Sequence, residues 1–130
     1  MRVLFVEDSE VNRRVIREML RAGDIEMEEA EDGAIGLEMV EAHDYDLILM
    51  DLRMPGMDGL TAIRKIRTRT DAKAQLPVIV VTADSGLTLE ADCQAAGADD
   101  VIRKPVDLST LFTTIGDLIA RRGQGGLVLS

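Results

Sequence analysis

The chain contains three short runs of consecutive apolar residues, at Val3 to Val6, Leu47 to Met50 and Val78 to Val81. Runs of this length are too short for globular helices and are typical of strands buried on both faces of a sheet. Weaker runs at Ile25 to Ala30 and Val101 to Ile102 add two candidate strands. The sequence therefore predicts five strands, three of them in the interior of a sheet.

Segments with the spacing of helices separate these runs. The clearest amphipathic stripe extends from Leu108 to Ile119, with apolar residues recurring every three or four positions. The other candidate helices are Val11 to Leu20, Gly33 to Ala42, Leu60 to Ile66 and Thr88 to Ala96. This (βα)5 alternation predicts an α/β fold, a doubly wound parallel sheet with right-handed crossovers and helices on both faces.

Composition limits the class of protein further. The length of 130 residues fits one domain, and 46% apolar residues with no Trp predict an aliphatic core. A formal net charge of -9 opposes direct binding to nucleic acid or to an anionic membrane surface. Cys93 is the only cysteine, which rules out an internal disulfide. With no signal-peptide pattern and no membrane-spanning run, we expect a cytoplasmic protein.

The last residues of the chain differ in composition from the rest. Gly123, Gly125 and Gly126 lie close together after the final predicted helix. Such a segment is typical of a flexible tail, either a chain terminus or the beginning of a linker. We therefore expect one folded domain over residues 1–121 and a flexible tail over residues 122–130.

Polar residues follow the predicted strands where an aliphatic core would not select them. Glu7 and Asp8 follow the first strand, Asp51 the third, Thr82 the fourth and Lys104 the fifth. Individually, an Asp or Thr here is explained by helix capping and a Lys by solvent exposure. Those explanations do not account for all five residues at the carboxyl edge of one parallel sheet, which is where ligands bind in such folds.

The three carboxylates predict a metal site. Carboxylates a few ångströms apart raise one another's pKa unless a cation lies among them. Oxygen ligands without His or Cys favour Mg²⁺, which takes one or two carboxylates together with waters and phosphate oxygens. A remaining Asp carboxylate is then able to attack phosphorus and form an aspartyl phosphate, with an ammonium and a hydroxyl stabilising the transferring oxygens.

With these residues in place, the chain resembles the receiver domain of two-component response regulators from Arg2 to about Arg121. The resemblance rests on four motifs in this order: Val6-Glu7-Asp8, the segment Met50 to Gly59, Val81-Thr82-Ala83 and Lys104-Pro105. It implies a flavodoxin-like sheet of strand order 2-1-3-4-5. It also implies a phosphoacceptor signalling domain that catalyses only its own phosphorylation and dephosphorylation, and is otherwise not an enzyme.

The resemblance assigns a role to each site residue. Asp51 would be the phosphorylation site and, with Asp8, a direct Mg²⁺ ligand. Glu7 would act on the metal mainly through water, and the backbone carbonyl of Arg53 would complete the site. Thr82 would hydrogen-bond the phosphoryl group.

Two further expectations follow from the Lys104-Pro105 motif. Lys104 would pair with the phosphoryl group. Pro105 would follow a cis peptide bond, which folded proteins retain only where the local geometry requires it.

The segment from Val6 to Arg13 most closely resembles receivers of hybrid kinases and phosphorelays. The implied phosphodonor is a histidine kinase or a histidine phosphotransfer protein, with a downstream partner that the sequence does not identify. His43, the only histidine, is expected on a solvated turn rather than in phosphotransfer. Arg13, Arg14 and Arg17 fit a solvated helix face and a donor-docking face equally well.

Position 101 departs from the family pattern. Many receivers have Tyr or Phe three residues before the Lys and swing that ring inward upon phosphorylation, whereas this chain has Val101. A valine has one stiff χ1 and no ring to move. We therefore expect the signal to pass mainly through the loop Ala83 to Leu87 and the helix Thr88 to Ala96.

Three other functions are compatible with parts of the pattern. An aspartate-dependent phosphatase would need a second Asp two positions after the nucleophile, where this chain has Arg53, and a substrate cap. A flavin carrier would need a Gly-rich phosphate loop where Glu7 to Glu10 would repel phosphate. An unphosphorylated pseudo-receiver usually lacks a site residue, and none is missing here.

Overall fold

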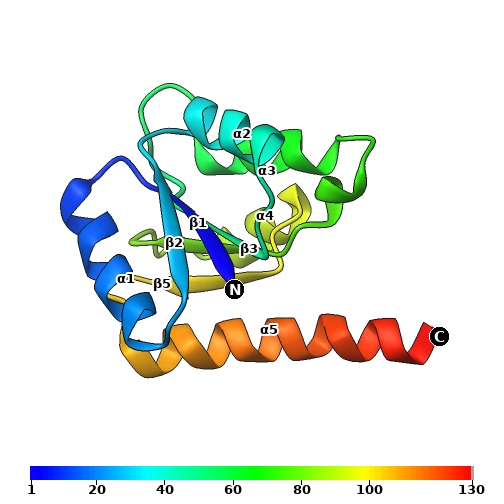
Figure 1. The fold of residues 1–130 in the computed structure, drawn as a ribbon. Helices are drawn as coiled ribbons and strands as arrows, with labels where there is room; N and C mark the ends of the chain where they lie inside the picture. The colour runs from blue at the N-terminus through cyan, green and yellow to red at the C-terminus, as the bar shows by residue number, and fades with distance from the viewer. Residues whose placement is uncertain (130) are drawn as a thin grey trace.

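The computed structural model describes residues 1–129, and side chains for residues 1–122. It contains a five-stranded parallel sheet covered by helices on both faces (Figure 1). The strands are β1 (Arg2–Val6), β2 (Glu26–Ala30), β3 (Leu47–Met50), β4 (Val78–Thr82) and β5 (Asp100–Arg103). The helices are α1 (Glu10–Ala22), α2 (Gly33–Ala42), α3 (Gly59–Arg67), the short 3-10 helix η1 (Ala72–Gln75), α4 (Leu89–Ala96) and α5 (Leu108–Leu129).

The strands lie in the order β2-β1-β3-β4-β5, which confirms the predicted doubly wound fold. All neighbouring pairs are parallel. Val6 of β1 pairs with Met50 of β3, and Met50 pairs with Val80 of β4. This register brings the residues that follow β1 and β3 to the same edge of the sheet.

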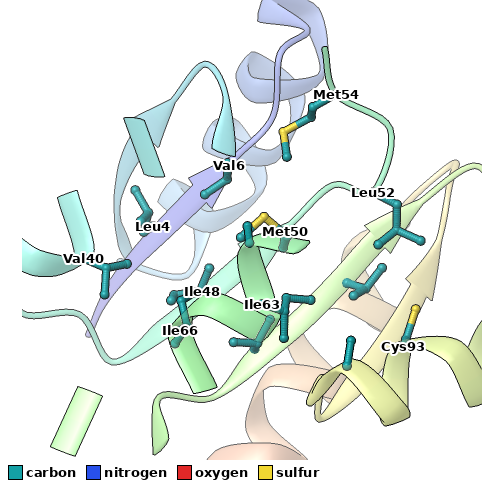
Figure 2. Close-up of a cluster of buried hydrophobic side chains, with 14 of the residues drawn as sticks. Leu4, Val6, Val40, Ile48, Met50, Leu52, Met54, Ile63, Ile66 and Cys93 are labelled. Carbon is teal, nitrogen blue, oxygen red and sulfur yellow. The ribbon is translucent and has the colours of Figure 1, made fainter. Parts of the chain in front are cut away.

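Successive strand residues face two separate core layers. Leu4 and Val6 belong to the layer beneath α2, α3 and α4, part of which is shown in Figure 2. Val3 and Phe5 belong to the layer beneath α1 and α5. Because both faces are covered, the interior strands need apolar residues at every position, which explains the uninterrupted apolar runs of β1, β3 and β4.

The two strands that were weak in the sequence lie at the edges of the sheet. β2 has the sequence Glu-Met-Glu-Glu-Ala, and only its last residue is fully buried. β5 at the opposite edge has a single fully buried residue, Ile102. Edge strands have one neighbour and more contact with solvent, so charged side chains are tolerated there and help prevent edge-to-edge association.

Helix capping separates structural polar residues from candidates for function. Ser9 is the N-cap of α1, and its hydroxyl accepts a hydrogen bond from the Asn12 backbone N–H at 3.3 Å. Asp8 is therefore not the capping residue. Thr82 is the last residue of β4, and the N-cap of α4 is Thr88. Neither Asp8 nor Thr82 is explained by capping.

The last helix extends beyond the sheet at the N-terminal ends of the strands (Figure 1). Residues 122–129 of the predicted tail, 122–130, form the last turns of α5, and residue 130 lies outside the described residues. The flexibility of this segment stays a prediction. Among the helices of the described chain, none combines the length and the apolar character needed to cross a membrane.

Candidate functional site

Three carboxylates converge at the carboxyl edge of the sheet. Glu7 and Asp8 directly follow β1, and Asp51 directly follows β3. One carboxylate oxygen from each lies within 4.8 Å of those of the other two. Glu7 is fully buried and Asp51 is 4% exposed, whereas Asp8 is exposed. The predicted acidic residues thus form a cluster that opens to solvent on the side of Asp8.

Lys104 is the nearest cation in this cluster. Its Nζ donates a hydrogen bond to Glu7 Oε1 at 2.7 Å and lies 3.6 Å from Asp51 Oδ1. The cross-sheet hydrogen bond from the Lys104 N–H to the Thr82 carbonyl, 2.7 Å long, anchors the Lys104 backbone. One ammonium beside three carboxylates leaves an excess of negative charge in a largely buried site.

The pKa values reflect this excess. Burial, then the neighbouring Glu7 carboxylate, raises the pKa of Asp51 to about 7. Burial also acts to raise the pKa of Glu7, but its neighbours Asp51, Lys104 and Asn12 together lower it below its usual value. The Asp51 carboxyl group therefore binds a proton more readily than an ordinary aspartate does.

The residues present fit a magnesium ion. Glu7 Oε2 is buried and, within the described part of the chain, has no hydrogen-bond partner. A buried carboxylate oxygen without a donor is costly, and a cation among the three carboxylates would satisfy it. The cluster offers only oxygen ligands, which favour a hard cation such as Mg²⁺.

Close backbone packing holds Asp51 in place. Gly59, the first residue of α3, lies so close to the Asp51 carbonyl that a Cβ there would collide with it. The Gly59 N–H also donates to the Leu52 carbonyl at 3.0 Å. At this end of the predicted motif, Asp58 caps α3, and Gly59 allows α3 to pack closely against the segment that carries Asp51.

Thr82 and Arg53 connect the site to the β4–α4 loop. Thr82 is fully buried, and its hydroxyl accepts a hydrogen bond from the Asp84 N–H at 3.1 Å. The exposed Arg53 side chain forms an ion pair with Asp84 at 2.8 Å. The metal-ligand role of the Arg53 carbonyl stays a prediction.

The Lys104–Pro105 peptide bond is cis, as the resemblance implies.

The arginines of α1 have different environments. Arg13 and Arg17 both form ion pairs with Glu29 of β2, at 3.1 and 2.6 Å. Arg14 projects into solvent with a side chain 65% exposed. The expectation of a solvated helix face therefore holds for Arg14, whereas Arg13 and Arg17 are held by Glu29. His43 is the exposed C-cap of α2, in agreement with the expected turn.

Sequence reasoning missed one residue that contacts the site. The Asn12 side-chain amide donates to Glu7 Oε1 at 2.8 Å from the first turn of α1. A single polar residue in a first helical turn is ordinary on a protein surface, so composition gave no signal. Its spacing of five residues from Glu7 becomes informative only once the strand-to-helix turn is known.

A doubly wound sheet with an acidic cluster and a lysine at its carboxyl edge defines a class of ligand-binding α/β domain, and comparisons with known proteins identify the family. The family model for the response regulator receiver domain matches residues 3–116. The chain therefore belongs to the receiver domain family, a signalling family of two-component systems rather than a group of metabolic enzymes.

Relatives and solved structures agree with this assignment. The chain is 43% identical to a two-component response regulator of Oryza sativa subsp. japonica over 85% of the chain and 88% of that protein. It is 32% identical to the chemotaxis protein CheY-3 of Vibrio cholerae, with 93% of each covered. The receiver domain of a Pseudomonas aeruginosa sensor histidine kinase has been solved with magnesium coordinated in its active site cleft. It superposes on this chain with a TM-score of 0.83 and 34% sequence identity, over 92% of this chain and 97% of that one.

The lengths of other relatives vary widely. The chain spans 3% and 5% of two hybrid signal transduction histidine kinases of Dictyostelium discoideum, and 52% of a cell cycle transcriptional regulator of Caulobacter vibrioides. The receiver domain thus occurs both nearly alone and as a small part of larger proteins.

Proposed function

We propose that this domain accepts a phosphoryl group from a phosphohistidine donor onto Asp51, in a Mg²⁺-dependent reaction, and that the aspartyl phosphate changes its surface to signal to a partner. The observation that carries the proposal is the convergence of Asp51 with Glu7, Asp8 and Lys104 at one edge of the sheet. Residues 1–121 would form the receiver and residues 122–130 a tail.

Asp51 would act as the nucleophile. One carboxylate oxygen forms a bond to phosphorus while the bond from phosphorus to the donor imidazole nitrogen breaks, and that nitrogen keeps the electron pair. Asp8 and Asp51 would hold Mg²⁺ directly, with Glu7 acting through water and the Arg53 carbonyl completing the site. The bound ion would offset the carboxylate charge and neutralise the transferring oxygens. Burial of Asp51 limits access of competing water.

Lys104 and Thr82 would bind the transferred group. The Lys104 ammonium lies 3.6 Å from Asp51 Oδ1, close enough to turn toward a phosphoryl group there. The Thr82 hydroxyl would donate a hydrogen bond to a phosphoryl oxygen. Because this hydroxyl accepts the Asp84 N–H, its displacement would pull on the β4–α4 loop.

The donor would be a histidine kinase or a histidine phosphotransfer protein that docks beside α1. Val11 and Val15 are 67% and 45% exposed on this helix. Val15 also lines a mostly apolar groove of about 440 Å³ that reaches Lys104 and Pro105. An apolar surface next to the acidic cluster fits a protein partner that must bring its phosphohistidine to Asp51.

The direct test is the intact mass of the protein after incubation with Mg²⁺ and acetyl phosphate. We expect the wild-type protein to gain one phosphoryl group and Asp51→Asn to gain none, while EDTA prevents the gain. An unphosphorylated wild type with a correctly folded site would support the pseudo-receiver alternative. Release of phosphate from small phosphomonoesters without labelling of the protein would support the phosphatase alternative.

We further propose that the switch passes through the β4–α4 loop. Asp84 is held by Arg53, and its carbonyl accepts a hydrogen bond from Arg103 at 2.8 Å. Arg103 also pairs with Glu90 on α4. A shift of Thr82 would thus change the positions of residues 83–96. Val101 is partly buried against the core layer beneath α2, α3 and α4.

Val101→Ala should leave phosphorylation and the partner response nearly unchanged, at a packing cost of about 1 kcal/mol. The reason is that valine has no alternative rotamer of large amplitude to contribute. Amide chemical shifts recorded before and after phosphorylation should change mainly at 83–96 in both proteins. Loss of these phosphorylation-dependent changes in a folded Val101→Ala protein would make position 101 a switch residue.

A further inference from the structure

The two carboxylate oxygens of Glu7 have unequal environments. Oε1 receives two hydrogen bonds, from Lys104 Nζ at 2.7 Å and from the Asn12 side-chain amide at 2.8 Å. Oε2 is buried and receives none from the described residues. The two donors therefore hold one oxygen of the carboxylate, which restricts its rotation and leaves the other oxygen without a donor among the described residues.

The first turn of α1 fixes Glu7 through its backbone as well. The Ser9 cap orders the Asn12 main chain, and the next residue, Arg13, donates from Nη1 to the Glu7 carbonyl at 2.8 Å. Arg13 is itself held by Glu29. Asn12 is half-buried, and its side chain reaches Glu7 from a backbone that is already ordered.

We propose that Asn12 is a positioning residue for phosphorylation: it orients Glu7 toward the magnesium site and remains bound to Glu7 when Lys104 moves to the phosphoryl group. This inference rests on the function proposed above. Asn12 does not touch the reacting atoms and acts only through Glu7.

Glu7 Oε1 has two donors, and Lys104 is one of them. The Lys104 ammonium lies 2.7 Å from Glu7 Oε1 but 3.6 Å from Asp51 Oδ1, so turning toward a phosphoryl group on Asp51 would draw it away from Glu7. When it leaves, a fully buried carboxylate oxygen would have no donor unless Asn12 stays. Asn12 suits this task because its amide is uncharged and so does not repel a cation in the cluster.

The test compares Asn12→Leu with wild type and with Arg14→Leu. Leucine has the same number and branching of side-chain heavy atoms as asparagine, but it donates no hydrogen bond and prevents water from taking the place of the amide. Arg14 lies on the same helix, is exposed and forms an ion pair with Glu10. Arg14→Leu is therefore a matched control that introduces the same leucine at an exposed position. Isothermal titration calorimetry gives the Mg²⁺ affinity, and intact mass gives the rate of phosphorylation by acetyl phosphate.

We expect Asn12→Leu to bind Mg²⁺ about 10-fold more weakly, the effect typical of residues that orient metal ligands. Its phosphorylation should remain slower even at saturating Mg²⁺. Lys104 would then be the remaining donor to Glu7 Oε1 and would move less readily toward the phosphoryl group. Asn12→Gln keeps an amide and should bind Mg²⁺ more tightly than Asn12→Leu. Arg14→Leu should match wild type in both measurements. Thermal unfolding in EDTA reports separately on the fold.

A double-mutant cycle isolates the contact with Glu7. In a Glu7→Ala background, Asn12→Leu should cause no further loss of Mg²⁺ affinity. An equal loss with and without the Glu7 carboxylate would overturn the positioning role, as would wild-type affinity and rate in Asn12→Leu. If the proposed function itself is wrong, none of these proteins, wild type included, will gain a phosphoryl group. The two failures are therefore distinguishable.

Discussion

Asp8→Ala is expected to abolish Mg²⁺-dependent phosphorylation while leaving the fold intact. Asp8 supplies one of the three carboxylates of the cluster, and it is the exposed one through which the cluster meets solvent. Residues that merely orient metal ligands change metal affinity by about 10–100-fold, so loss of a direct ligand should exceed about 100-fold. The fold should persist because Ser9, not Asp8, caps α1, and because removing one carboxylate relieves repulsion.

Calorimetric titration with Mg²⁺ and intact mass after treatment with acetyl phosphate measure the two effects. Glu38→Ala is a suitable control, since it removes the same charge from an exposed position on α2 away from the cluster. We expect the control to bind Mg²⁺ and to be phosphorylated as the wild type is. Undiminished labelling of Asp8→Ala would disprove the metal assignment.

Lys104→Ala is expected to uncouple phosphorylation from the conformational response. The ammonium is the cation beside both Glu7 and Asp51, and a dianionic phosphoryl group would draw it away from Glu7. Without it, the contact between Asp51 and the residue that follows β5 is lost. Labelling should slow about 100-fold or more, the effect typical of removing a group that stabilises transferring charge.

The response is measured as amide chemical shift changes in protein that has been fully phosphorylated. We expect the changes at 83–96 to be strongly reduced in Lys104→Ala, and unchanged in Lys65→Ala, which removes an exposed lysine from α3. If phosphorylated Lys104→Ala reproduces the wild-type changes, Lys104 does not transmit the signal.

The sequence predicted most of the fold because the interior strands are buried on both faces. Val3 to Val6 and Leu47 to Met50 have no polar interruption, and their ends were predicted to the residue or within one. β2 was weak for a physical reason: as an edge strand with three glutamates it lacks the apolar pattern on which the prediction depends. Its place was nevertheless fixed by the alternation of strands and helices.

The acidic residues and Lys104 were predictable because strand ends in a parallel sheet meet at one edge. The contacts around them were not. The bond between Asn12 and Glu7 depends on the turn geometry after β1, and the Arg13–Glu29 and Arg17–Glu29 pairs depend on the packing of α1 against β2. Such side-chain partners lie 5 to 16 positions apart and leave no periodic signal in the sequence.

The residue that carries the phosphoryl group can be identified chemically. Borohydride reduces an acyl phosphate of aspartate to homoserine, so protein treated with Mg²⁺ and acetyl phosphate, then reduced and digested, carries a permanent mark at the acceptor. We predict homoserine at position 51 alone, and none when Mg²⁺ is withheld. A mark at any other aspartate, or stable phosphate on a hydroxyl side chain with Asp51 unmodified, would show that Asp51 is not the sole acceptor.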